Sequence, residues 1–164
     1  DTRHGTCMDW RMTLIDLLSP AAVISPLRAN GKKQALLELA QQAAQLTGLS
    51  ERDLFEALLQ RERLGSTGIG DGIAIPHGRM AGIDRLVGLF ARAEKPIDFD
   101  ALDGQPVDLI FVLIAPEGAG ADHLKALARV ARVLRNPAVL EQVRAARDPA
   151  AIYAILSESA AQAA

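Results

Sequence analysis

Apolar residues recur along this chain with two different periods, and the change of period separates the expected helices from the expected strands. A spacing of three to four residues predicts a helix over residues 32–46 and a second helix that runs to about Arg63. Gly48 is a stop signal between them, and Ser50 with Asp53 forms a capping box for the second helix. The apolar stripes of the two helices are Leu36, Leu39, Ala40 and Ala43, then Leu54, Phe55, Leu58 and Leu59.

Shorter and more continuous apolar runs predict the strands. Residues 23–27 fit a short edge strand, because Pro26 has no backbone N–H to donate to a neighbour. Two further strands are expected around residues 73–75 and over 85–93. The run VDLIFVLIAP, residues 107–116, is nearly continuous in β-branched and large apolar residues, so we expect a central strand covered on both faces.

Capping signals mark the helices of the last third of the chain. Asp122 is expected to cap a helix from about His123 to Leu134, and Asp148 followed by Pro149 opens a last helix. Two helices, a block of strands and two or three further helices fit one α/β domain with helices on both faces of the sheet.

Composition narrows the function classes. The 164 residues, 49% hydrophobic and 23% charged, suit one globular domain, and a formal net charge of -2 predicts no general attraction to nucleic acid or anionic lipid. Cys7 is the only cysteine, so a reducing cytoplasm is the expected setting. No apolar run is long enough to span a bilayer, which predicts no direct membrane insertion. Residues 1–11 lack the apolar core of a signal peptide and are interpreted as a disordered tail or expression remnant.

Five glycines and one histidine crowd into GSTGIGDGIAIPHGR, residues 65–79. Glycine is costly to order, so this is either an awkward turn or a place where the backbone approaches something small and charged. The stretch lacks the lysine of a Walker A loop and the spacing of a dinucleotide fingerprint. His77 and His123, with Asp71 or Asp122, lack the spacing of metal ligands, and Ser66 lies outside a G-x-S-x-G elbow.

A histidine nucleophile is the remaining chemical interpretation. A neutral imidazole can attack a phosphoryl group, and catalysis then needs positioning and charge stabilisation. Glycine N–H groups, the hydroxyls of Ser66 and Thr67, a second imidazole and an arginine suit that task. We expect Pro76 and a tight exit at Gly78 to hold the ring of His77 at the end of a strand.

From the residues alone, the alternative that His77, His123 and Arg61 have ordinary structural roles stays open. His77 fits an ordinary Pro-His-Gly turn, His123 the first turn of a helix, and Arg61 a solvated helix face.

The segments GSTGIGDGIAIPHGR, PIDFDALDGQPVDLIFVLIAP and HLKALARVARVL resemble the enzyme IIA family of the phosphoenolpyruvate-dependent phosphotransferase system. The resemblance is to the fructose/mannitol type, and within it to the nitrogen regulatory IIA proteins. It implies a mixed β-sheet flanked by helices, in a type 2 IIA domain over residues 12–158, with 159–164 as a tail. It also implies that His77 is the phosphoacceptor and that His123 and Arg61 complete the catalytic set. The residues expected to support the phosphoryl group are Ser66, Thr67, Gly68 and Gly70.

The resemblance implies a phosphoryl carrier without metal or cofactor, rather than an enzyme that turns over a free small substrate. The donor would be a phosphohistidine carrier protein like HPr, and the phosphorylation state would regulate cytoplasmic or membrane-protein targets, with no nucleic acid as partner. A sugar-specific IIA component that passes phosphate to a IIB domain is the alternative. The GSTGIG segment and the lack of an attached IIB-like or membrane domain favour regulation. A non-phosphorylated binding domain is a third hypothesis, disfavoured by the complete set of His77, His123 and Arg61.

Overall fold

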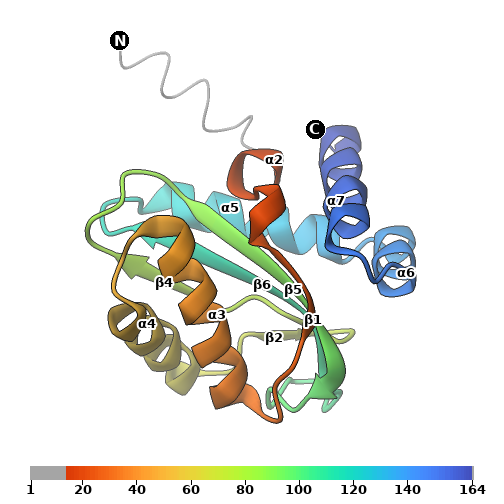
Figure 1. Cartoon of the computed structure of the whole chain (residues 1–164), viewed down its shortest axis with the longest axis horizontal. Coiled ribbons are helices and arrows are strands. Elements are labelled where there is room, and N and C mark those ends of the chain that lie inside the picture. The colour runs from red at the N-terminus through yellow and green to blue at the C-terminus, as the bar shows by residue number, and fades with distance from the viewer. Residues whose placement is uncertain (1–13, 164) are drawn as a thin grey trace.

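The computed structural model describes residues 14–163, which form a mixed six-stranded β-sheet with helices on both sides (Figure 1). The first half of the chain contains α2 (Leu14–Leu17), the 3-10 helix η1 (Pro20–Ala22), β1 (Val23–Leu27), α3 (Lys32–Thr47), α4 (Glu51–Leu64), β2 (Gly68–Gly70), β3 (Ile73–Ala74) and β4 (His77–Met80). The second half contains β5 (Val87–Ile97), β6 (Val107–Pro116), α5 (Ala121–Leu134), α6 (Pro137–Ala145) and α7 (Pro149–Ala163). The expected tail at residues 1–11 lies outside the described residues.

The sheet is organised around β6. Its strand order is β1-β5-β6-β3-β2, and β4 also pairs with β6. β6 is antiparallel to β5 and parallel to β3 and β4, and each of its residues from Leu109 to Ala115 is fully buried. The expectation of a central strand covered on both faces is therefore confirmed, as is the edge position of β1.

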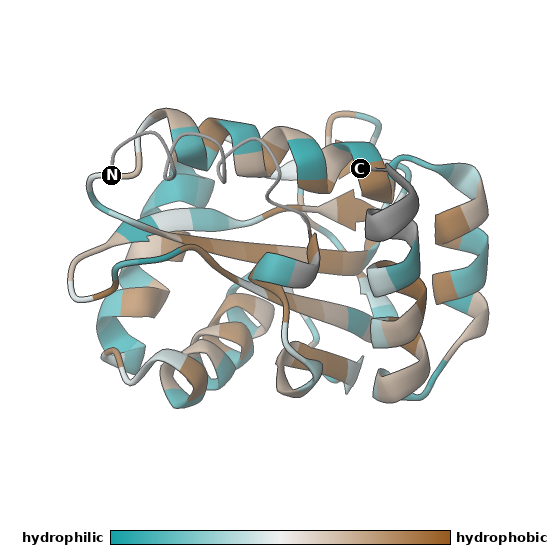
Figure 2. Cartoon of the chain, turned by 90° about the horizontal axis from the view of Figure 1, so that it is seen from above, coloured by the Kyte–Doolittle hydropathy of each residue, from teal (hydrophilic) through white to brown (hydrophobic). Residues whose placement is uncertain are grey.

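Helices cover the two faces of the sheet. Figure 2 shows the largely hydrophobic strands running between α5 on one side and α3 with α4 on the other. Gly48 ends α3 with a positive φ of 76°, and the Ser50 hydroxyl caps α4 by accepting a hydrogen bond from the Asp53 N–H at 3.3 Å. The two helices and their boundary agree with the pattern of the sequence.

β3 and β4 lie one after the other along the same side of β6, and the pairing is interrupted before His77. Ile73 pairs with Leu109 and His77 pairs with Leu113, so both parts keep the same register on β6. Pro76 lies in the break, where its missing N–H removes one ladder bond while its carbonyl still accepts from Leu113 N at 3.0 Å. His77 is therefore the first residue of β4, directly after the break.

The expected tight exit at Gly78 is wrong. Gly78 lies within β4, and its lack of a side chain instead lets α4 pack closely, since a Cβ there would lie 3.3 Å from the Cβ of Ala57. The close packing brings the C-terminal half of α4 against the strand that carries His77.

A two-residue hairpin accounts for part of the glycine-rich stretch. Asp71 and Gly72 have positive φ values of 58° and 79° and join β2 to the antiparallel β3, as in the type I′ turns favoured by Asp-Gly. The Arg144 side chain donates to the Asp71 carbonyl and to both carboxylate oxygens of Asp108, which anchors the turn to α6. β2 has the sequence GIG, and its glycines give no alternating apolar pattern, so the sequence analysis did not predict this strand.

Two element boundaries differ from the expectations. Gly120, not Asp122, is the N-cap of α5, so Asp122 lies inside the first turn, where a carboxylate is still favoured by the helix dipole. β5 runs on to Ile97, past residue 93. The last helix, α7, extends to Ala163.

We expect Gly72→Ala to destabilise the fold more than Gly104→Ala. Both glycines have a positive φ, 79° and 72°, which costs an L-residue about 1–2 kcal/mol. A Cβ at Gly72 would also lie 2.5 Å from Nη2 of Arg144 and 2.7 Å from Oδ1 of Asp108, whereas Gly104 has open space. Urea unfolding should show an additional loss of about 2 kcal/mol for Gly72→Ala, because charged hydrogen bonds are displaced. Equal losses would contradict the anchoring role of Arg144.

Candidate phosphoryl-transfer site

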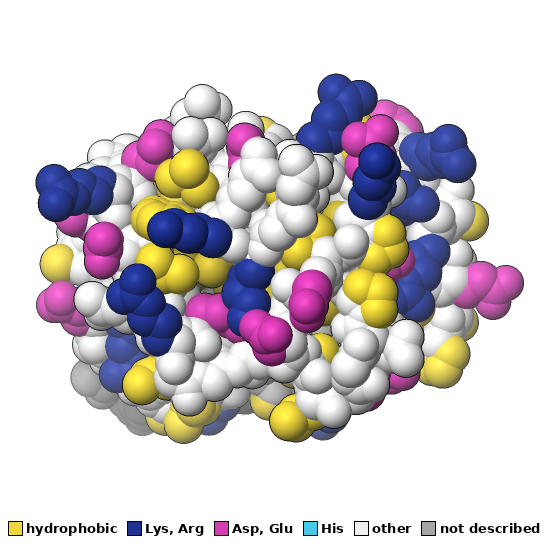
Figure 3. Space-filling model, turned by 90° about the horizontal axis from the view of Figure 1, so that it is seen from below, with side chains coloured by type: hydrophobic (Ala, Val, Ile, Leu, Met, Phe, Trp, Pro, Cys, Tyr) yellow, Lys and Arg dark blue, Asp and Glu magenta, His cyan; other side chains and the backbone are white. Residues whose placement is uncertain are grey.

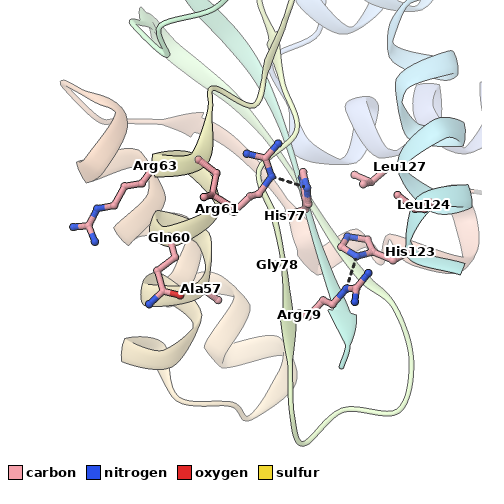
Figure 4. Close-up of a pocket in the computed structure, with 11 residues that line it drawn as sticks. Ala57, Gln60, Arg61, Arg63, His77, Gly78, Arg79, His123, Leu124 and Leu127 are labelled. Atoms are coloured by element: carbon pink, nitrogen blue, oxygen red, sulfur yellow. Dashed lines mark hydrogen bonds between the residues drawn. The ribbon is translucent and has the colours of Figure 1, made fainter. Parts of the chain in front are cut away.

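A pocket of about 630 Å³ opens between α4, β4 and the beginning of α5 (Figure 4). It brings together Arg61, His77 and His123, three residues that are far apart in sequence and that the sequence analysis singled out. The lining residues are Ala57, Gln60, Arg61, Arg63, Leu64, His77, Gly78, Arg79, His123, Leu124 and Leu127.

Two hydrogen bonds define the protonation of His77. Its Nδ1 lies 2.9 Å from the carbonyl oxygen of Ile75, which can only accept, so Nδ1 carries the proton. Nε2 lies 3.1 Å from Nε of Arg61, which can only donate, so Nε2 presents a lone pair. Of the two ring nitrogens of His77, only Nε2 is therefore able to act as a nucleophile. The Arg61 guanidinium is itself held by a 2.8 Å bond from Nη1 to the Gly65 carbonyl.

His123 lies beside His77 with its ring nearly perpendicular. The ring centroids are 5.3 Å apart and the planes meet at 76°. His123 is only 5% exposed; its Nδ1 accepts from Nε of Arg79 at 3.3 Å, and its buried Nε2 has no partner. The pocket thus contains one nitrogen able to attack and one N–H able to donate.

Both imidazoles are neutral near pH 7. Burial lowers the pKa of the His77 ring, and the positive charge of Arg61 lowers it further, against the opposing hydrogen bond to Ile75 and the charge of Glu62. Burial also lowers the pKa of His123, to about 4, with added repulsion from His77 and Arg79. Neutral rings keep the lone pair of His77 available for attack.

Arg79 was missed by the sequence analysis. It stands two residues after His77 on β4, and alternation along a strand puts both side chains on the same side. Recognising β4 as a strand would have pointed to it, but HGRM has no alternating apolar pattern.

The four residues expected to support the phosphoryl group are not among those lining the pocket. The Ser66 hydroxyl donates to the Phe99 carbonyl, and Gly68 pairs with Ala74 in the hairpin. The backbone N–H and hydroxyl of Thr67 both donate to the carboxylate of Glu62, which is only 7% exposed. Gly70 belongs to the same hairpin, where it pairs with Ile73. These residues fix the loop after α4 and leave the pocket to its imidazoles and guanidiniums.

Neither a metal-binding cluster nor a membrane-spanning helix is found in the part of the chain that the structure describes. Within residues 14–163, no three His, Cys, Asp or Glu side chains cluster as a metal site requires. Among the same residues no helix is both long and apolar enough to cross a bilayer.

The fold and the paired imidazoles define a class of protein, the IIA components of phosphotransferase systems. The family model described as "Phosphoenolpyruvate-dependent sugar phosphotransferase system, EIIA 2" matches residues 16–159. The chain belongs to this family, and the resemblance found in its sequence is confirmed.

Within the family, the chain is similar over most of its length to nitrogen regulatory proteins. It is 58% identical over 146 residues to the nitrogen regulatory protein of Bradyrhizobium diazoefficiens, which covers 89% of this chain and 95% of that one. The crystal structure of nitrogen regulatory protein IIA-Ntr from Neisseria meningitidis has a TM-score of 0.82 and 38% identity, covering 88% of this chain and 99% of that one. A fructose-specific EIIA component of Haloferax volcanii is 34% identical over 152 residues, 90% of this chain and 97% of that protein. The comparisons support the nitrogen-related over the sugar-specific hypothesis.

We expect the ring of His123 to titrate near pH 4 and that of His77 below 6.5, as followed by NMR. The unfolded chain then binds protons more tightly than the folded chain between these values, so stability falls as the pH drops from 6.5 towards 4. His123→Asn should flatten that part of the pH–stability curve measured by urea unfolding. A His123 titration near 6.5 would show that the ring is not kept neutral by burial.

Proposed function

We propose that this chain is a phosphohistidine carrier of a nitrogen-related phosphotransferase system. It accepts a phosphoryl group on His77 from the phosphohistidine of an HPr-like carrier protein, and its phosphorylation state regulates cytoplasmic or membrane-protein targets. The observation that carries the proposal is the lone pair of His77 Nε2, held in an open pocket beside an unpaired N–H of His123.

The transfer step is a direct exchange between two nitrogens. Nε2 of His77 attacks phosphorus in line, and the new N–P bond forms as the N–P bond of the donor breaks, leaving its electron pair on the donor nitrogen. The proton stays on Nδ1, which keeps donating to the Ile75 carbonyl, so no proton has to leave His77. Burial of the pocket strengthens the hydrogen bonds that the phosphoryl oxygens receive there.

Arg61 changes its partner during this step. Nε2 can no longer accept a hydrogen bond once it is bonded to phosphorus, so the guanidinium turns its donors to the phosphoryl oxygens. A planar guanidinium suits this exchange because it presents several donors in a fixed fork. Arg61 also holds the Gly65 carbonyl, so the change reaches the C-terminus of α4.

The surface around the pocket suits a protein partner. Leu64 and Leu124 line it and are 85% and 66% exposed, which is unusual for large apolar side chains. Figure 3 shows one face of the molecule, seen from below, on which hydrophobic side chains also reach the surface on the left, next to Lys and Arg side chains.

Phosphorylation changes this surface electrostatically. The phosphoryl group adds about -1.5 to -2 charges beside Arg61, Arg63 and Arg79. A partner that binds the basic, apolar surface of the free protein therefore meets a different charge on the phosphorylated one. This difference, with the similarity to nitrogen regulatory proteins, favours regulation over sugar uptake.

We expect His77→Ala to abolish phosphoryl incorporation and His123→Ala to slow it by about 10- to 1000-fold, because only His77 supplies the nucleophile. The measurement is labelling from phosphoenolpyruvate through purified carrier proteins, with folding of both variants checked by circular dichroism. Gln60→Ala, on the pocket lining but without a charge, is the control and should label as wild type. Full labelling of His77→Ala would refute the acceptor assignment.

We also expect the set of captured cytosolic proteins to change with phosphorylation. Wild-type protein, free and phosphorylated, and His77→Ala treated in the same two ways serve as baits for mass spectrometry. Only the wild type should show a difference between its two states. Efficient transfer of the label to a IIB protein and then to a sugar, with no state-dependent capture, would instead support the sugar-specific hypothesis.

A further inference from the structure

Arg79 is a pocket residue to which neither the sequence motif nor the transfer step gives a role. Its Nε donates to Nδ1 of His123, and the close-up shows His123 lying between His77 and Arg79 (Figure 4). Arg79 comes from β4 and His123 from the first turn of α5, so this contact joins the edge of the sheet to the helix opposite.

The contact determines which nitrogen of His123 carries the proton. An arginine side chain has donors only and keeps its proton in proteins, so it cannot accept from an imidazole N–H. Nδ1 of His123 must therefore be the unprotonated nitrogen, and the proton of the neutral ring lies on Nε2.

That Nε2–H is a buried donor without an acceptor. Nε2 of His123 is one of three buried side-chain nitrogen or oxygen atoms without a partner among the described residues. Leaving such a donor unpaired costs about 1–3 kcal/mol, so the fold tolerates an unfavourable state where a ligand can relieve it. His77 is the neighbouring ring, with its centroid 5.3 Å away.

We infer that Arg79 is a positioning residue: it holds His123 as the Nε2–H tautomer, so that this N–H donates to a phosphoryl oxygen while the group is bonded to His77. The inference rests on the proposed function, and it adds a residue outside the set of Arg61, His77 and His123. Arg79 acts through His123 and does not itself touch the reacting atoms.

A guanidinium is well matched to this task. A hydroxyl or a second imidazole at the position of Arg79 can reverse its hydrogen bond, and the proton of His123 would then move to Nδ1. Nε2 would then present a lone pair to the negatively charged phosphoryl oxygens. Arg79 removes this alternative and adds a positive charge on the same side of the pocket.

Three variants distinguish the effect of the His123 tautomer on transfer from the effect of the positive charge of Arg79. Arg79→Glu replaces a donor by a group that only accepts, so it should move the proton of His123 to Nδ1. Arg79→Gln removes the charge, and because its amide can either donate to Nδ1 or accept from it, the transfer rate should follow the tautomer that this variant shows. Arg63→Glu introduces the same negative charge into the lining of the same pocket from α4, without facing Nδ1 of His123.

The experiment has two readouts on the full chain. Nitrogen-15 NMR of the histidine rings at pH 8.5, on the unphosphorylated protein, reports the tautomer of His123. The rate of labelling from the phosphorylated carrier protein reports transfer. We expect the Nε2–H tautomer in the wild type and in Arg63→Glu, and the Nδ1–H tautomer in Arg79→Glu. We expect Arg79→Glu to transfer at least about tenfold more slowly than Arg63→Glu. Arg79→Gln should stay within a few-fold of wild type where His123 keeps the Nε2–H tautomer, and should be as slow as Arg79→Glu where it does not.

Several outcomes overturn the inference. It is wrong if Arg79→Glu keeps the Nε2–H tautomer, or if it transfers as fast as Arg63→Glu. It is also wrong if Arg79→Gln keeps the Nε2–H tautomer yet transfers as slowly as Arg79→Glu, since charge alone would then explain Arg79, or if it loses that tautomer yet transfers as fast as wild type. A wild-type protein that accepts no label refutes the proposed function. The nitrogen-15 spectra of the wild type and of Arg79→Glu still show whether Arg79 controls the tautomer of His123.

Discussion

The hydrogen bond between Nδ1–H of His77 and the Ile75 carbonyl is the interaction on which the site depends. It commits one nitrogen to the proton and leaves the other as a lone pair. This hydrogen bond spans the break between β3 and β4, because Ile75 precedes Pro76 and His77 follows it. Arg61 donates to Nε2, and it can do so only because the proton of the ring lies on Nδ1.

The pocket keeps its imidazoles neutral and places permanent positive charges around them. Burial and the nearby guanidiniums of Arg61 and Arg79 lower the pKa of the His77 and His123 rings, so cationic imidazole is disfavoured. In the proposed transfer, the same guanidiniums attract the dianionic phosphoryl group. One arrangement of charges thus suits both stages of the proposed step: a neutral nucleophile before transfer and a stabilised anion after it.

The loop after α4 is held by a separate buried network. The Glu62 carboxylate accepts from the backbone and hydroxyl of Thr67 and from Nζ of Lys32, which also bridges to Asp100. Glu62 directly follows Arg61 in the sequence, so one turn of α4 both anchors the loop and contacts His77. This division explains why the hydroxyls of Ser66 and Thr67 serve the fold while the pocket relies on rings and guanidiniums.

Apolar spacing with capping signals determined the helices α3, α4, α5 and α7, and the continuous apolar run determined the buried strand β6, since burial imposes a pattern that the sequence records directly. Pro26 by itself indicated the edge position of β1. The motif by itself singled out Arg61, His77 and His123. Tertiary structure alone decided that β2 and β4 are strands, because their short glycine- and histidine-containing segments gain order only from pairing with β3 and β6. It also decided that Arg79 donates to His123 and that the hydroxyls of Ser66 and Thr67 donate to Phe99 and Glu62. Such contacts depend on the orientation of side chains from distant segments, which no local pattern encodes.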